Sequence, residues 1–156
     1  MAQEFEGDLL LIDTPDGGDI VIEDGLFTAD TAFSTAVYLS LFGGNKEDAG
    51  KIKTNKTWWG NTLEGITEAE KIVSRFQHII TAMPLSVKNI KAAEAAAILD
   101  LQWIIDLEIA DKIESECLTR EKGIFILLIN ILKNKNTIFK TNYSSLWTGT
   151  GAAYGI

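Results

Sequence analysis

Residues 123–132, with the sequence GIFILLINIL, limit the fold of this chain more than any other stretch. The stretch is apolar at nearly every position, so both faces of a strand built from it must be covered by other parts of the protein or by another subunit. It is about half as long as the roughly 20 residues that a membrane-spanning helix needs, and it carries an Asn. The stretch therefore predicts a buried strand and no transmembrane segment.

The segments on either side of this stretch have the pattern of two further strands. Ile113, Ser115 and Cys117 alternate with charged residues, which is typical of a strand with one face in water. The sequences REKG and KNKN predict turns before and after the apolar stretch, and TIFKTNYSSLW follows the second turn. We expect three consecutive strands that form an antiparallel meander.

Three helices are predicted before the meander. The first covers TADTAFSTAVYLSLF and ends at a Gly-Gly pair. The second begins with Thr67 and Glu70 in the spacing of a capping box and ends before Pro84. The third begins at a cap on Ser86 and runs through five closely spaced alanines to Ile105. Its alanine face is predicted to pack inside the protein, with a groove for a partner helix as the alternative.

The N-terminal end is predicted to form a β-hairpin, because two short apolar runs flank the turn-forming sequence PDGG. Three aspartates around this turn lack the spacing of a calcium loop. The chain is therefore predicted to be an α+β protein with about three helices and a meander packed on the long third helix. Its 156 residues are expected to form a single domain. The expected order is an N-terminal hairpin (8–24), helices with a tryptophan loop (28–106), a C-terminal sheet (109–147) and a mobile tail (148–156).

The net charge of −8 limits the partners that the chain can bind. An acidic surface repels phosphate backbones and anionic lipids, so no nucleic-acid or membrane partner is predicted. Cys117 is the only cysteine, which excludes a disulfide within the chain and a Cys-rich zinc site, and its alternating strand predicts a buried, inert thiol. The acidic start lacks the basic residues of a secretory signal, so we expect folding in the cytoplasm. No metal or cofactor is predicted.

No catalytic residue is predicted, although two patterns could suggest one. His78 is the only histidine, and a helical wheel places it opposite the apolar stripe of its helix, as an ordinary surface residue. Glu64 and Glu68 could be the acid and base of a glycosidase. With 22 acidic residues such a pair arises easily by chance, and Glu68 is explained by the dipole at a helix N-terminus. A peptidoglycan-directed hydrolase or glycan-binding tail protein that uses Glu64 and the neighbouring tryptophans stays the alternative.

The sequence KTWWGNT places Trp58 and Trp59 side by side in a segment with no helical or strand period. Burying a large aromatic side chain contributes a few kcal/mol, which is enough to fix the shape of a loop. Adjacent residues of an extended segment point to opposite sides, so one ring is expected in the core and the other against a groove or a partner. Gly60 is expected to let the chain turn directly after them.

The order of these motifs resembles a known family. The segment DGLFTADTAFSTAVYLSLF, the WWG loop, the Ala-rich helix that ends in LQWIID and the meander that closes on YSSLW resemble the Mu-like phage and prophage baseplate family, gene product forty-six. The similarity covers about residues 8–147. The chain departs from the family pattern at Asn61, where Asp is common, and at Leu107, where Gly is usual.

The resemblance implies a non-enzymatic structural component of a contractile-tail baseplate, similar to sheath-initiator wedge proteins. Such proteins assemble with other baseplate proteins and with sheath or hub proteins, and they offer a sheet edge to which a sheath subunit adds a strand. The expected location is the virion tail, after assembly in the host cytoplasm, and a homo-oligomer is compatible with this role. A soluble adaptor outside any phage is a third reading. The structural or interface candidates are Trp58, Trp59, Gly60, Trp103, Ile138, Phe139 and Trp147.

Overall fold

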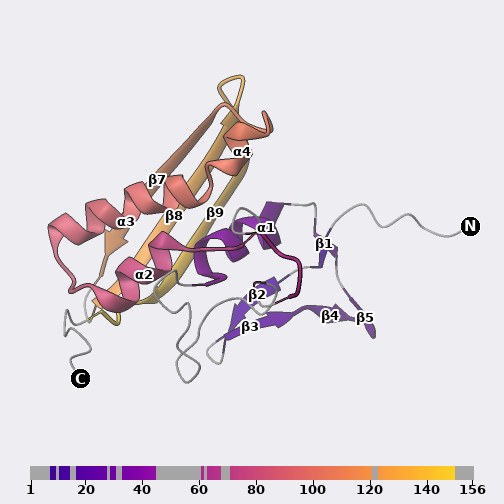
Figure 1. The fold of residues 1–156 in the computed structure, drawn as a ribbon, viewed down its shortest axis with the longest axis horizontal. Helices are drawn as coiled ribbons and strands as arrows, with labels where there is room; N and C mark the ends of the chain where they lie inside the picture. Colours follow the sequence, from indigo (N-terminus) through magenta and orange to yellow (C-terminus); the bar gives the residue numbers. More distant parts are fainter. Residues whose placement is uncertain are drawn as a thin grey trace, which may run out of the picture. The chain divides into compact units, whose positions relative to one another are not determined.

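The computed structural model describes residues 8–9, 11–14, 17–27, 29–30, 33–44, 61, 63–67, 71–120 and 123–149. The chain divides into two compact units, residues 1–39 and 40–156, and each unit is described by itself (Figure 1). The expectation of a single domain stays a prediction.

The described residues of the N-terminal unit form three pairs of short antiparallel strands. Their bounds are β1 (Asp8–Leu9), β2 (Leu11–Thr14), β3 (Gly17–Ile20), β4 (Ile22–Glu23), β5 (Leu26–Phe27) and β6 (Ala29–Asp30). β2 and β3 form the predicted hairpin, with Leu11 opposite Ile20, and β1 pairs with β6. β4 and β5 form a second hairpin that was not predicted. Its turn residues Asp24 and Gly25 have φ values of 52° and 77°, as in a type I′ turn.

The first predicted helix is α1 (Phe33–Phe42), which begins in the N-terminal unit and ends in the C-terminal one. It begins later than residue 28, where the sequence pattern changes, and ends at the predicted Gly-Gly pair. Val37 and Leu41 have no exposed surface.

The C-terminal unit contains the predicted meander, which together with the helices confirms an α+β fold (Figure 1). β7 (Lys112–Thr119), β8 (Ile124–Lys133) and β9 (Asn136–Leu146) pair antiparallel in the order β7-β8-β9. β8 and β9 are joined by a two-residue turn at Asn134 and Lys135, whose φ values of 51° and 66° suit the twist of a tight hairpin.

The second helix begins later than its capping box predicts, so that part of the prediction is wrong. α2 spans Arg75–Ala82, and Ser74 is its N-cap, with Oγ accepting a hydrogen bond from the Gln77 N–H at 2.9 Å. Thr67 is not helical, and Glu70 lies outside the described residues.

Hydrogen bonds from other parts of the chain explain this late start. The Asn61 Nδ2 donates to the Ile72 carbonyl at 2.6 Å, and the Ile72 N–H donates to Asn61 Oδ1 at 2.8 Å. The Ser74 N–H donates to the Gly44 carbonyl at 2.6 Å. A longer helix would need these groups for its own backbone bonds, so the helix begins only after Ser74.

The third predicted helix is divided into two. α3 (Val87–Asp100) begins at the predicted cap, Ser86, and a turn separates it from the short α4 (Trp103–Asp106). The alanine face packs inside the protein as predicted, because Ala93 and Ala97 have no exposed surface. No helix within the described ranges is both long and apolar enough to span a bilayer.

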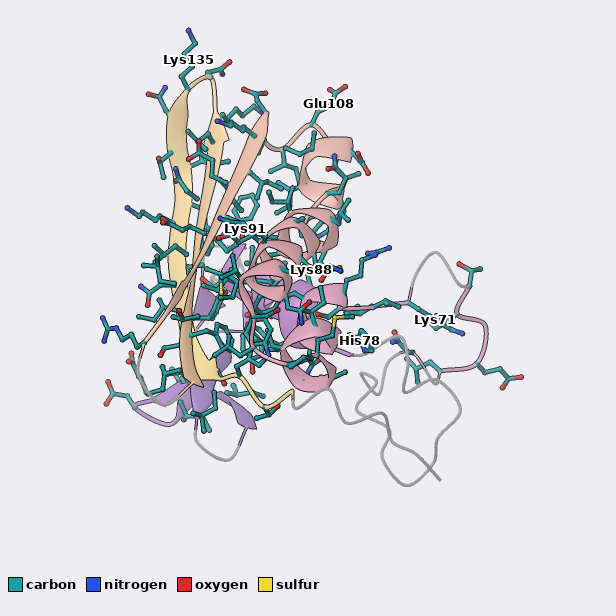
Figure 2. All side chains as sticks on the ribbon, turned by 90° about the vertical axis from the view of Figure 1, so that its left-hand side faces the viewer. Lys71, His78, Lys88, Lys91, Glu108 and Lys135 are labelled. Atoms are coloured by element: carbon teal, nitrogen blue, oxygen red, sulfur yellow. The ribbon has the colours of Figure 1, made fainter. Side chains whose placement is uncertain are left out.

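Helices α2, α3 and α4 lie on one side of the sheet, which we call the inner face (Figure 2). Phe125, Leu127, Ile129 and Ile131 of β8 are at most 1% exposed, and β8 contributes them at alternate positions. Edge-to-face aromatic contacts with ring-centroid distances of 5.3 to 6.1 Å join five residues of this core. In order of contact they are Tyr143, Phe42, Phe76, Phe125 and Trp147.

The other side of the sheet, which we call the outer face, is less buried. Its β8 residues Ile124, Ile126 and Leu128 are half-buried, in contrast to the fully buried positions between them. Leu118 of β7 and Leu146 of β9 are 43% and 57% exposed. The run of apolar residues in β8 therefore supplies both the core of the inner face and an apolar strip on the outer face.

Candidate functional site

The structure places four of the seven predicted interface residues. Trp58, Trp59 and Gly60 lie outside the described residues, so the division of roles between the two rings stays a prediction. Trp147 and Trp103 are part of the C-terminal unit, and Ile138 and Phe139 lie in β9.

Trp147 anchors the end of the sheet to the end of α2. Its ring is 8% exposed, and its Nε1–H donates to the Met83 carbonyl at 2.7 Å. The following residues continue this contact, because the N–H groups of Thr148 and Gly149 donate to the Ile80 carbonyl at 3.0 and 2.9 Å. Residues 148 and 149 thus have backbone partners, residues 150–156 lie outside the described residues, and a mobile tail stays a prediction.

Trp103 has a similar anchoring role at the start of α4. It is half-buried, and its Nε1–H donates to Ser40 Oγ at 3.0 Å, which joins α4 to the last turn of α1. Both tryptophans described by the structure thus use the indole N–H to join segments far apart in the sequence.

The outer edge of β9 carries backbone groups that do not bond to β8. The Trp147 N–H donates to the Gly123 carbonyl, so alternation along an antiparallel pair directs the backbone groups of Lys140, Asn142, Ser144 and Leu146 away from β8. Among the described residues, no strand pairs with β9 on that side. Ile138, 43% exposed, lies near the start of this edge.

The outer edge of β7, in contrast, has a backbone donor occupied by a side chain of α3. The Cys117 N–H points away from β8 and donates to Glu94 Oε1 at 2.9 Å. The Glu94 side chain is only 13% exposed, and its other oxygen accepts a hydrogen bond from Lys91 Nζ at 2.7 Å. Burial acts to raise the pKa of Glu94, but the bonds from Cys117 and Lys91 outweigh it and lower the pKa. Glu94 therefore stays charged, and it accepts the hydrogen bond from an edge N–H group that could otherwise pair with another strand.

Cys117 is buried, as the sequence predicts. Burial raises the pKa of the thiol to about 11, and the negative charge of Glu94 makes a smaller contribution in the same direction. A thiol with this pKa is protonated at neutral pH and is a poor nucleophile.

The structure describes only some of the remaining candidate residues. His78 is half-buried, and its Nδ1 is buried with no hydrogen-bond partner among the described residues, so it is not the ordinary surface residue that the helical wheel predicts (Figure 2). Glu64 is exposed in a turn, and Glu68 lies outside the described residues, so their pairing stays untested. Within the described residues, no three His, Cys, Asp or Glu side chains gather as metal ligands would.

Sequence reasoning missed a buried polar cluster at the start of α2. The Asp100 side chain has no exposed surface, and its two oxygens accept bonds from the Phe76 N–H at 2.8 Å and from Arg75 Nη1 at 3.1 Å. Ser74 Oγ donates to the Leu41 carbonyl beside it. Burial raises the pKa of the Asp100 carboxyl, and the bonds from Phe76 and Arg75 oppose this shift only in part.

A sequence signal for this cluster exists. Asp100 follows the buried alanines of α3 at a spacing of three and four residues, so a carboxyl group stands on the apolar face of the helix. The pairing of Asn61 with Ile72 has no comparable signal, because it joins two segments without a period.

Comparison with known proteins identifies no relative: no family model, no curated protein and no solved structure matches this chain.

Proposed function

We propose that this protein is a structural component of a contractile-tail baseplate, of the sheath-initiator type, and that it acts by protein–protein assembly. The observation that carries the proposal is the difference between the two edges of the sheet. Glu94 occupies an outward N–H of β7, whereas four residues of β9 direct their backbone groups to an edge that no described strand covers. Addition of a partner strand to such an edge uses backbone hydrogen bonds and needs no particular side chain.

Three further features support this proposal. The order of the sequence motifs resembles the Mu-like baseplate family over about residues 8–147. The anchoring of Trp147 to α2 fixes the end of β9, so that the edge has a defined position before a partner binds. The net charge of −8 suits a protein whose partners are other proteins and not nucleic acid or lipid.

The proposed partners are a sheath or hub protein and other baseplate proteins, and the proposed location is the tail of the particle after assembly in the host cytoplasm. The reading frames beside the gene give a first test, because genes for a tail spike and a larger wedge protein are expected close by. Neighbouring genes unrelated to tails would favour an adaptor outside any phage.

Complementation gives the direct test. In a prophage whose own copy of the gene is deleted, we expect electron microscopy to show no complete contractile tails, and a wild-type copy to restore them. A copy that lacks residues 137–156 should fail to restore tails, since it lacks β9, whereas His78→Ala should restore them. Normal tails in the deletion strain would refute the proposed function.

A further inference from the structure

The outer face of the sheet carries an apolar strip with charged and polar residues on both sides. Ile126 and Leu128 of β8 form its centre and are half-buried. The exposed side chains of Glu114 and Glu116 lie on the β7 side, and those of Lys140 and Asn142 lie on the β9 side. The two glutamates thus lie on one side of the strip, opposite Lys140 and Asn142. Glu114 already accepts hydrogen bonds within the chain, at Oε1 from Lys112 Nζ at 2.7 Å and at Oε2 from Asn130 Nδ2 at 3.0 Å.

The strand register places these groups at matching levels. Glu114 pairs with Asn130 of β8, which in turn pairs with Lys140. In the same way Glu116, Leu128 and Asn142 form one row across the sheet. Each acceptor therefore has a donor at its own level on the opposite side of the apolar strip.

This arrangement is complementary to itself. Two copies can pack outer face to outer face around a two-fold axis that runs parallel to the strands. This axis places β7 of one copy against β9 of the other, and each row of paired residues faces the same row of the second copy. Glu114 then faces Lys140 of the second copy, and Glu116 faces Asn142. The central Leu128 residues lie against each other. An axis across the strands would instead lay β7 over β7 and bring the glutamates of the two copies together, which like-charge repulsion disfavours.

We propose that the outer face of this sheet binds a second copy of the chain, in a two-fold dimer with parallel strand axes held by Leu128 and by reciprocal contacts of Glu114 with Lys140. The dimer removes Ile126, Leu128 and part of Leu118 from water. It leaves the outer edge of β9 accessible, so it neither requires nor prevents the strand addition proposed above.

The size of the face sets the expected strength of the dimer. The face is three strands wide, at about 4.8 Å for each strand, and about eight residues long, at about 3.3 Å for each residue. Its area is therefore roughly 400 Å². A stable, specific interface buries about 800 Å² for each partner, so the dimer is expected to be reversible, with a Kd in the micromolar range. The Lys112–Glu114 ion pair of 2.7 Å competes for the glutamate and further limits the contribution of each charged contact.

Sedimentation equilibrium of the full chain tests the proposal. The wild-type protein should change from monomer to dimer as its concentration rises through the micromolar range. Glu114→Lys and Lys140→Glu should each weaken the dimer about tenfold, because both symmetric contacts become repulsive. The double variant should return the Kd to near the wild-type value, since it exchanges the charges and restores both contacts.

Matched controls separate this surface from the others. Lys88→Glu makes the same charge change as Lys140→Glu, but on the helical layer, and should leave the Kd unchanged (Figure 2). Leu118→Lys places a charge beside the apolar strip at an exposed position, so it should dissociate the dimer while the circular dichroism spectrum stays that of the wild type. A wild-type protein that stays monomeric up to about 1 mM overturns the proposal. A dimer that tolerates Leu118→Lys, or a double variant that is not restored, overturns it as well.

Discussion

Trp147 offers the most specific test of how the sheet is joined to the helices. Its ring is 8% exposed, contacts Phe125 edge to face at 6.1 Å, and donates from Nε1 to the Met83 carbonyl at 2.7 Å. Trp147→Ala removes the ring and leaves a cavity, which costs about 3 to 5 kcal/mol in a core. Against the total stability of a domain, about 5 to 15 kcal/mol, this loss is large.

Trp147→Phe separates the hydrogen bond from the ring. The variant keeps an apolar ring against Phe125 but leaves the Met83 carbonyl without its partner, so we expect a loss of about 1 to 3 kcal/mol. Leu146→Ala is the control on the same strand, since Leu146 is 57% exposed and its truncation should change the free energy of unfolding by less than about 0.5 kcal/mol.

Urea unfolding followed by circular dichroism measures all three variants without relying on tryptophan fluorescence. We expect the urea midpoints to fall in the order Leu146→Ala, Trp147→Phe, Trp147→Ala, from highest to lowest. Equal midpoints for Trp147→Ala and Leu146→Ala would refute the anchoring of the sheet to α2.

Three other predictions concern stability and activity. Gly149→Ala should destabilise the protein by about 1 to 3 kcal/mol in the same unfolding assay, because an added Cβ would overlap the backbone of Met83, and an unchanged midpoint would contradict this close approach. Burial raises the pKa of Asp100 in the folded state, so the folded protein binds a proton at this carboxyl more readily than the unfolded chain does. The stability of the wild type relative to Asp100→Asn should therefore rise as the pH falls from neutrality towards about 3.9, the ordinary pKa of an Asp side chain. Unfolding curves at several pH values check this, and a difference that does not vary with pH rejects the assigned cause. Purified protein should not clear a suspension of peptidoglycan, and clearing that Glu64→Gln abolishes would favour the glycan hydrolase.

The C-terminal sheet could be predicted from the sequence because its signals are local. The alternation of apolar and charged residues in β7 and the apolar run of β8 indicate which faces of the strands are buried, and the turn residues mark where each strand ends. The cap at Ser86 was also predictable, since the N-cap bond is made within one helical turn.

The errors arise where contacts between distant residues decide the local structure. The capping box at Thr67 has the required spacing, but Asn61 and Gly44 hold the backbone before Arg75 in other hydrogen bonds. The Gly-rich composition after Trp147 likewise gives no sign of the hydrogen bonds that Thr148 and Gly149 donate to Ile80.

The candidate surface was only partly predictable for the same reason. The resemblance and the apolar strand favour the proposed assembly through the sheet, but they do not indicate on which edge a backbone donor is occupied. The choice depends on Glu94, which lies 23 residues before the backbone group that it binds.

Ser144 provides the most direct measurement of the central claim, because its backbone N–H points to the outer edge of β9. Ser144→Pro removes that donor and places a ring at the edge without removing a bond to β8, and proline is tolerated at such edge positions. Ser144→Ala changes the same side chain and keeps the N–H. In the complementation assay with electron microscopy, we predict complete tails with Ser144→Ala and none with Ser144→Pro, with both proteins folded by circular dichroism. Complete tails with Ser144→Pro would contradict assembly through the edge of β9.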